Sequence, residues 1–376
     1  MEGLLPRSNH GILDTINGLL GRLLEDGLVD ALLVPMEVPR GGNVAQALVR
    51  DPARLAAAVP VSPVMPVNSA TIVSNLTLDR GVRRVGAVLR SCEIRALVEL
   101  VKLNQSCLDN LLIIGVDCPG TFTVADYASM VEASVGESRA RRFLDEAMGD
   151  EGHYREGYAL RTACRICERP VPEFGDILIG FLGTDPGEPL SVEVDERIAE
   201  GGLGRLGLLE GGLEKRQERV RRLVDARLAA RDQALAEVRA STGSAQGLLN
   251  YFAACLTCHN CSVTCPICYC RQCVFTGPTF DYSSAQYMRR AARKGALRMP
   301  ADTILYHLTR MNHMATSCVG CGQCESGCPS RLPLTAIFRS VGQKVQALYD
   351  YVPGRSLQEE PPVMTFREDE LETVAR

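Results

Sequence analysis

The alternation of apolar and polar residues along the first half of the chain predicts an α/β domain. Apolar residues recur at helical spacing over residues 12–24 and end before Gly27, which predicts a helix, and a second helical pattern covers 93–103. Buried strands are predicted for the short apolar runs 31–34, 85–89, 111–116 and 176–182. The proline-rich stretch 59–66 predicts irregular surface chain. Strands that alternate with helices are typical of a largely parallel sheet, which we expect within residues 1–185.

Beyond residue 185 the pattern is helical. A charge-rich stretch over 208–240 predicts one long helix, most simply a solvated arm within a linker of residues 186–248. Helical spacing of apolar residues returns at 304–311, which favours a helical domain over 249–335. Residues 336–376 are expected to form a C-terminal tail that is poorly packed at its acidic end.

Composition narrows the function classes. With 376 residues the chain is long enough for two or three domains, and no apolar run reaches membrane-spanning length, so no membrane insertion is expected. A net charge of −4 and the lack of Trp disfavour a nucleic-acid binder. The chain has 16 cysteines and no pattern typical of a secretion signal, which predicts a cytoplasmic protein with metal chemistry rather than disulfides.

Two cysteine quartets near the C-terminus carry the strongest chemical signal. They are Cys255, Cys258, Cys261 and Cys265, followed by Pro266, and Cys318, Cys321, Cys324 and Cys328, followed by Pro329. Each repeats the spacing C-x2-C-x2-C-x3-C-P, by which bacterial-type ferredoxins bind [4Fe–4S] clusters with the fourth cysteine on the neighbouring cluster. Zinc motifs rarely repeat three such spacings and a proline. The predicted ligands are therefore Cys255, Cys258, Cys261 and Cys328 for one cluster, and Cys318, Cys321, Cys324 and Cys265 for the other.

A second set of cysteines is dispersed along the α/β region. Cys92 and Cys118 each follow a predicted parallel strand, and the carboxyl ends of such strands meet at the edge where ligands bind. Cys164 and Cys167 form a C-x2-C pair. These four thiols could bind a third cluster; the alternative is that Cys92 and Cys118 are small buried core residues, as free cysteines often are.

The residues around these cysteines resemble a known family. The segments 85–97, 112–118 and 164–183, which contain Cys92, Cys118 and the C-x2-C pair, resemble in order and spacing the coenzyme F420 hydrogenase/dehydrogenase β-subunit family. The resemblance implies that Cys92, Cys118, Cys164 and Cys167 hold one [4Fe–4S] cluster beside a flavin such as FAD. This chain has Arg90-Ser91 where the family usually has Thr-Pro.

The added two-cluster module extends the resemblance. The long interval between the quartets is similar to the α-helical ferredoxins of succinate dehydrogenase and heterodisulfide reductase, and the whole chain resembles a formate dehydrogenase β subunit. That implies an oxidoreductase subunit that relays electrons from a catalytic subunit, of formate dehydrogenase or hydrogenase type, to a flavin or a heterodisulfide-reductase-like acceptor. The alternative is a flavin subunit that itself oxidises or reduces coenzyme F420 or a nicotinamide.

Three further thiols, Cys268, Cys270 and Cys273, follow the first quartet closely. Three ligands in one loop could bind a fourth cluster with one more ligand, such as Cys107, or they could serve packing alone. No residue pattern identifies a catalytic acid, base or nucleophile. The expected fold is thus a parallel-sheet α/β domain with an α-helical dicluster domain.

Overall fold

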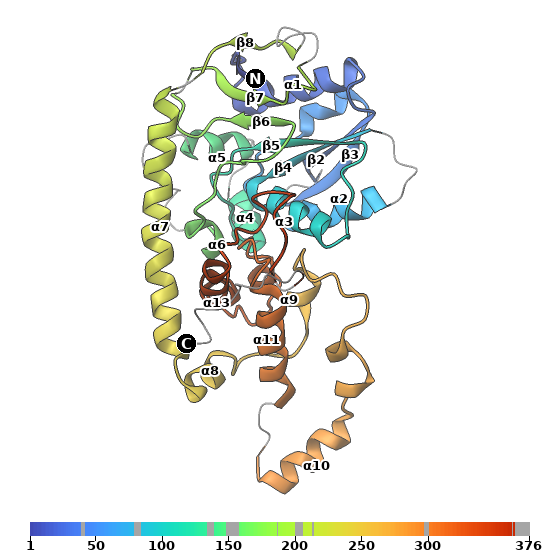
Figure 1. Cartoon of the computed structure of the whole chain (residues 1–376), viewed down its shortest axis with the longest axis vertical. Coiled ribbons are helices and arrows are strands. Elements are labelled where there is room, and N and C mark those ends of the chain that lie inside the picture. Colours follow the sequence, from blue (N-terminus) through green and yellow to red (C-terminus); the bar gives the residue numbers. More distant parts are fainter. Residues whose placement is uncertain are drawn as a thin grey trace. The chain divides into compact units, whose positions relative to one another are not determined.

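The computed structural model describes residues 1–38, 42–78, 84–133, 139–147, 158–185, 187–199, 206–212, 214–296, 301–362 and 364. The chain forms two compact units, coloured along the sequence in Figure 1. The first unit contains 1–232, 319–321 and 353–360, and the second contains 233–318, 322–352 and 361–376. No helix within the described ranges has the length and apolar character that a membrane crossing requires.

The first unit is built on one sheet of eight described strands. In chain order these are β1 (Glu2–Leu5), β2 (Ala31–Glu37), β3 (Val44–Val49), β4 (Val85–Arg90), β5 (Leu111–Val116), β6 (Ile177–Gly180), β7 (Leu190–Val194) and β8 (Leu209–Glu210). Their spatial order is β3-β2-β4-β5-β6-β7-β1-β8. The central strands β2, β4, β5 and β6 pair in parallel, and the outer pairs are antiparallel. The predicted parallel-sheet domain is therefore confirmed.

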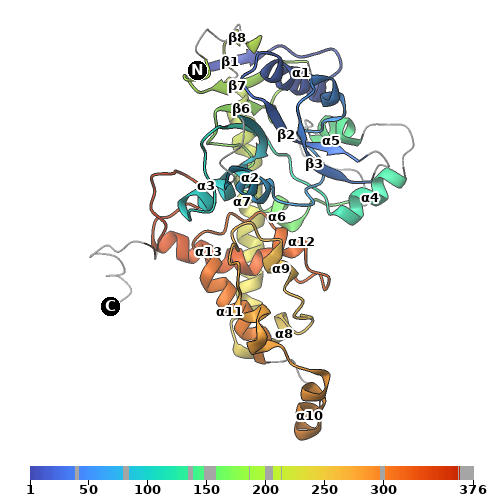
Figure 2. The ribbon, with the colours of Figure 1, turned by 90° about the vertical axis from the view of Figure 1, so that its right-hand side faces the viewer.

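Helices cover both faces of this sheet. They are α1 (Ile12–Glu25), α2 (Ser69–Leu78), α3 (Ser91–Lys102), α4 (Val124–Glu132), α5 (Arg139–Ala147) and α6 (Thr162–Arg165), with a 3-10 turn at Pro52–Ala57. Figure 2 shows α1 and α3 on opposite faces of the sheet. The apolar stripe of α1, Ile16, Leu19, Leu20 and Leu23, is fully buried. Burial of each such side chain stabilises the fold by about 1.5–3 kcal/mol, which explains why the stripe predicted this helix.

Strand β2 runs further than the sequence predicted. It continues through Pro35 to Glu37: parallel pairing with β4 involves only residues 31–33, and the antiparallel register with β3 continues beyond it, with Pro35 opposite Gln46. Proline has no N–H to give to a ladder. Its carbonyl is satisfied by the Val59 N–H at 2.8 Å, so the strand tolerates it there.

The proline-rich stretch 59–66 is buried except for Pro66, so its prediction as surface chain was wrong. Val61 and Val64 are at most 1% exposed. The Pro63 carbonyl accepts from the Phe122 N–H at 2.8 Å, and the Ser62 carbonyl accepts from Arg90 Nη2 at 2.5 Å. Prolines lack N–H groups, and the Ser62 hydroxyl both accepts from the Val64 N–H and donates to the Val64 carbonyl, which lowers the cost of burying this stretch.

The linker predicted over 186–248 is in part strand and in part a packed helix. β7 and β8 lie within it and join the sheet. The long helix α7 (Glu214–Thr242) places Arg216 2.8 Å from the Asp117 carboxylate, and Arg227 Nη2 donates to the Pro119 carbonyl at 2.6 Å. Periodicity located this helix well. It did not reveal that some of its arginines point into the protein.

The second unit is helical. Its helices are α8 (Ala245–Tyr251), α9 (Asn260–Val263), α10 (Ser284–Lys294), α11 (Ala301–Met314), α12 (Gln323–Ser326) and α13 (Leu334–Leu348), with 3-10 turns at Val274–Thr276 and Pro278–Phe280. The described residues of this unit contain no element of the sheet. The predicted α-helical dicluster domain is therefore confirmed.

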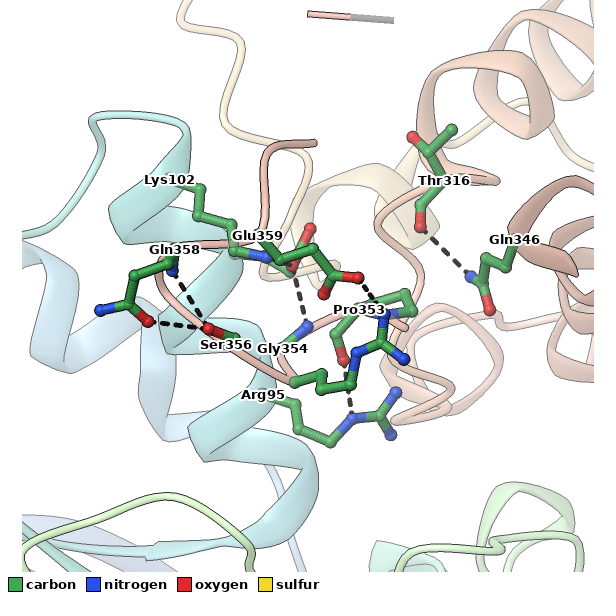
Figure 3. A network of polar contacts seen from close by, with 11 residues as sticks. Arg95, Lys102, Thr316, Gln346, Pro353, Gly354, Ser356, Gln358 and Glu359 are labelled. Atoms are coloured by element: carbon green, nitrogen blue, oxygen red, sulfur yellow. Dashed lines mark hydrogen bonds and ion pairs between the residues drawn. The ribbon is translucent and has the colours of Figure 1, made fainter. Parts of the chain in front are cut away.

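The C-terminal range 336–376 is better packed than a tail. Most of α13 lies within it, and Ile337 and Phe338 are buried. Residues 353–360 belong to the first unit, where Arg95 Nε donates to the Pro353 carbonyl at 2.9 Å and the Gly354 N–H donates to Glu99 at 2.8 Å (Figure 3). Residues from 365 onward lie outside the described residues.

Candidate iron–sulfur sites

A pocket in the first unit brings together four cysteines that lie far apart in the sequence. Cys92 is in the first turn of α3, directly after β4, and Cys118 follows the end of β5 by two residues. Cys164 lies in α6 and Cys167 follows that helix. All four line one pocket at the edge where the parallel strands end, which is where α/β proteins bind ligands. Their assignment as the ligands of one cluster stays a prediction.

The polar lining of this pocket is rich in arginine. Arg90, Arg161, Arg169 and Arg227 line it beside the cysteines. Arg90 Nη1 is buried and has no hydrogen-bond partner among the described residues, a state that costs about 1–3 kcal/mol. An iron–sulfur cluster with thiolate ligands would offer negative charge and sulfur acceptors at this place. The donor set therefore fits a [4Fe–4S] cluster.

The thiols of the pocket are strongly influenced by burial and by one another. Burial, and then the charges of Glu93 and neighbouring thiols, raise the pKa of Cys92. Burial raises the pKa of Cys118 to about 11. For Cys164 burial also acts upward, but the Arg161 charge and hydrogen bonds from Thr121 outweigh it and lower the pKa. Metal binding requires thiolates, so the Arg161 charge offsets part of the free-energy cost of deprotonating Cys164.

A fifth cysteine, Cys321, also lines this pocket. The segment 319–321 groups with the first unit, and Arg95 Nη1 donates to the Val319 carbonyl at 3.2 Å. The motif spacing predicted Cys321 as a ligand of the dicluster domain. The spacing could not predict that Cys321 also lies beside Cys92. The structure adds this proximity.

The two C-terminal motifs have left-handed backbone at the same two positions. In the first, Thr257 and His259 have φ values of 53° and 62°; in the second, the equivalent Gly320 and Gly322 both have 72°. A short helix follows in each case, α9 and α12. Left-handed backbone costs a non-glycine residue about 1–2 kcal/mol, so the first loop keeps this shape against its residue preferences. His259 therefore shapes this loop through its left-handed backbone conformation.

The fourth cysteine of each motif lies near the other motif. Burial raises the pKa of Cys255, and the charges of Cys261, Cys328 and Cys258 add to the increase. Burial likewise raises the pKa of Cys265, and Cys318 contributes to that shift. These neighbours are the ones that the predicted ligand crossover requires. The ligand sets themselves stay predictions.

Sequence reasoning missed three polar residues on α11. Tyr306 Oη lies 3.2 Å from Cys261 Sγ, and His307 Nε2 lies 3.3 Å from Cys255 Sγ. Arg310 Nη2 donates to the Cys261 carbonyl at 2.9 Å. The apolar positions of this helix predicted that it forms. Which of its faces contacts the cysteines is known only from the structure.

The remaining cysteines leave the fourth cluster open. Burial raises the pKa of Cys268 to about 11, with smaller effects from Cys265, Cys270 and Cys273, so these thiols are neighbours. Cys107 belongs to the first unit, where its Sγ accepts from the Asp109 N–H at 3.4 Å. Within the described ranges no three His, Cys, Asp or Glu side chains are placed to hold a single metal ion. The ligands of a cubane bind four separate irons and therefore lie farther apart.

The helical unit and its paired motifs define an iron–sulfur protein of the electron-transfer class. Residues 267–333 match the family model of a 4Fe-4S dicluster domain. The chain is 25% identical to the F420-dependent formate dehydrogenase subunit beta of Methanocaldococcus jannaschii, over 94% of both chains. It is 26% identical to the F420-dependent formate dehydrogenase 1 subunit beta of Methanococcus maripaludis, over 75% of both. Over most of its length the chain is thus similar to β subunits of F420-dependent formate dehydrogenases, and its C-terminal part matches a 4Fe-4S dicluster domain.

Among solved structures, a chain of the F420-reducing [NiFe] hydrogenase complex from Methanosarcina barkeri is similar, with a TM-score of 0.48 and 15% identity. The match covers 65% of this chain and 94% of that one.

We expect about twelve irons per chain after anaerobic purification, because three cubane clusters carry four irons each. Iron and sulfide analysis measures this. Replacing Cys164 by serine should remove about four irons and leave the dicluster signals in the electron paramagnetic resonance spectrum. A wild-type chain with about eight irons and free thiols at Cys92, Cys118, Cys164 and Cys167 would contradict the third cluster.

Proposed function

We propose that this chain is the electron-relaying β subunit of an oxidoreductase of formate dehydrogenase or hydrogenase type. The observation that carries the proposal is the pocket lined by Cys92, Cys118, Cys164 and Cys167, four thiols collected from separate parts of the sequence. Together with the paired C-terminal motifs, one chain would then carry three clusters. The names of the two relatives, both β subunits of formate dehydrogenases, support the same conclusion.

Cys321 supports a route between the clusters. It is a predicted ligand of a dicluster centre, and it lines the pocket of the four dispersed cysteines. Iron–sulfur clusters pass single electrons, and their potentials depend on the charge and hydrogen bonds around the sulfurs. A cluster bonded to Cys321 would therefore exchange electrons with the third cluster over a short path. The relay would lead from a catalytic subunit to a flavin or a heterodisulfide-reductase-like acceptor.

A second candidate is a subunit that carries a flavin and itself reduces or oxidises coenzyme F420. The specific support is that both relatives are named as F420-dependent. In this case the clusters would exchange electrons with a flavin bound by this chain. The two candidates differ in one measurable property, which is the presence of FAD in the purified protein.

The decisive experiment is anaerobic purification of the tagged chain from its native cells. We expect a hetero-oligomer on gel filtration that contains molybdenum or tungsten, or nickel, from the catalytic subunit, together with iron. FAD released on denaturation, with F420 reduction by the complex, would favour the second candidate. A monomer that turns over a soluble substrate unaided would overturn the relay.

A further inference from the structure

One face of α11 presents polar side chains to the cysteines of the first motif. Tyr306 Oη and Cys261 Sγ are 3.2 Å apart, and His307 Nε2 and Cys255 Sγ are 3.3 Å apart. Tyr306 is 2% exposed and His307 1% exposed, so both contacts are made by buried side chains. A thiolate that binds iron can only accept hydrogen bonds, which makes the tyrosine hydroxyl and the histidine N–H the donors.

The ring of His307 is held in one orientation. It stacks on Phe252 with a centroid distance of 3.9 Å and an interplanar angle of 10°. A neutral ring that donates from Nε2 leaves Nδ1 as an acceptor. Nδ1 is indeed buried without a hydrogen-bond partner in the described part of the chain.

Arg310 is buried and only partly satisfied. Its side chain is 5% exposed, and Nη2 donates to the Cys261 carbonyl, while Nε and Nη1 have no hydrogen-bond partner among the residues that the structure describes. The guanidinium lies over the Phe338 ring, 4.8 Å from its centroid. Buried donors are normally paired, and each unpaired one costs free energy. Packing against Phe338 alone would not require a cation.

The contacts of Arg310 tie it to the first motif. The carbonyl that accepts from Nη2 at 2.9 Å belongs to Cys261, a predicted ligand of the first dicluster centre. The guanidinium also lies 5.7 Å from the centroid of the Tyr306 ring, whose hydroxyl contacts Cys261 Sγ.

We propose that Arg310, Tyr306 and His307 together raise the reduction potential of the first cluster of the dicluster module, the one with Cys255 and Cys261 among its predicted ligands. A reduced cluster carries one more negative charge than an oxidised one. A nearby cation and hydrogen-bond donors therefore stabilise the reduced form. The inference concerns a cluster that the proposed function uses, but it needs no partner subunit.

The test is a redox titration of the purified chain followed by electron paramagnetic resonance. In Arg310→Gln, the midpoint potential of the first cluster should shift to a more negative value, with iron content unchanged. Arg310→Lys keeps the charge and should retain most of the potential. Arg289→Gln is the matched control: it removes the same charge from an exposed position on α10, and both potentials should stay at wild-type values.

Tyr306→Phe separates the two centres. It keeps the ring and removes the hydroxyl near Cys261, so only one of the two potentials should become more negative. Unchanged potentials in Arg310→Gln, or a shift of the same size in Arg289→Gln, would overturn the inference. No catalytic partner enters the titration. If the purified chain had no partner subunit but its variants shifted the midpoint potentials as expected, the proposed function would be overturned and this inference would stand.

Discussion

Replacing Cys265 by serine should remove the cluster bound by Cys318, Cys321 and Cys324, although Cys265 belongs to the first motif. The reason is the geometry of the paired motifs, in which the fourth cysteine serves the neighbouring cluster. The structure places Cys318 close enough to Cys265 to raise its pKa, after burial. About four irons should be lost, or one cluster should change its spectrum and potential, while the Cys255 cluster keeps both.

The reciprocal variant is the control for that result. Cys328→Ser should affect the Cys255 cluster, because Cys328 is among the neighbours that raise the pKa of Cys255. Iron analysis and electron paramagnetic resonance of both variants compare the two losses directly. If Cys265→Ser removed the Cys255 cluster and spared the other, each motif would bind its own cluster and the crossover would be wrong.

The features that sequence predicted well are those with a local signature. The motif spacing predicted the dicluster domain, because a cubane needs closely spaced thiolates in a tight loop; the eight cysteines as its ligands stay a prediction. The buried runs 31–34, 85–89 and 111–116 identify strands because parallel strands are buried on both faces. The grouping of Cys92 and Cys118 followed from one rule, the convergence of parallel strand ends, and the C-x2-C spacing suggested Cys164 and Cys167 as the other two thiols.

What the sequence could not predict depends on contacts between distant segments. Stretch 59–66 looks like surface chain because prolines are usual there, yet it is buried except for Pro66, and Met65 within it lines the cysteine pocket. Arg227 looks like one more charge on a polar helix, yet it is 8% exposed and lines the same pocket. Residue type and hydrophobic periodicity predict the helix or strand in which a side chain lies. They do not identify what that element packs against.

Arg216 on α7 is the clearest case of such a hidden role. Its Nη2 lies 2.8 Å from the Asp117 carboxylate, whose side chain is fully buried. The same carboxylate accepts the Phe181 and Leu182 N–H groups, each at 2.8 Å, and so ties the end of β6 to the end of β5. Asp117 directly precedes Cys118. The ion pair therefore anchors the backbone that carries one predicted cluster ligand.

Arg216→Met should destabilise the protein by about 3–5 kcal/mol, because it leaves a buried carboxylate without its cation. Anaerobic urea unfolding measures this. Burial already raises the pKa of Asp117, and Arg216 opposes that shift. Without the arginine the pKa should rise further, so the destabilisation should shrink as pH falls and the carboxyl becomes protonated.

Arg222→Met on the same helix is the matched control. Arg222 pairs with Glu218 at the surface, its side chain is 75% exposed, and its loss should change stability by less than about 0.5 kcal/mol. Adding Asp117→Asn to Arg216→Met removes the unpaired charge and should restore part of the stability at neutral pH. Equal effects of Arg216→Met and Arg222→Met, with no pH dependence, would show that α7 is only the solvated arm that its sequence suggests.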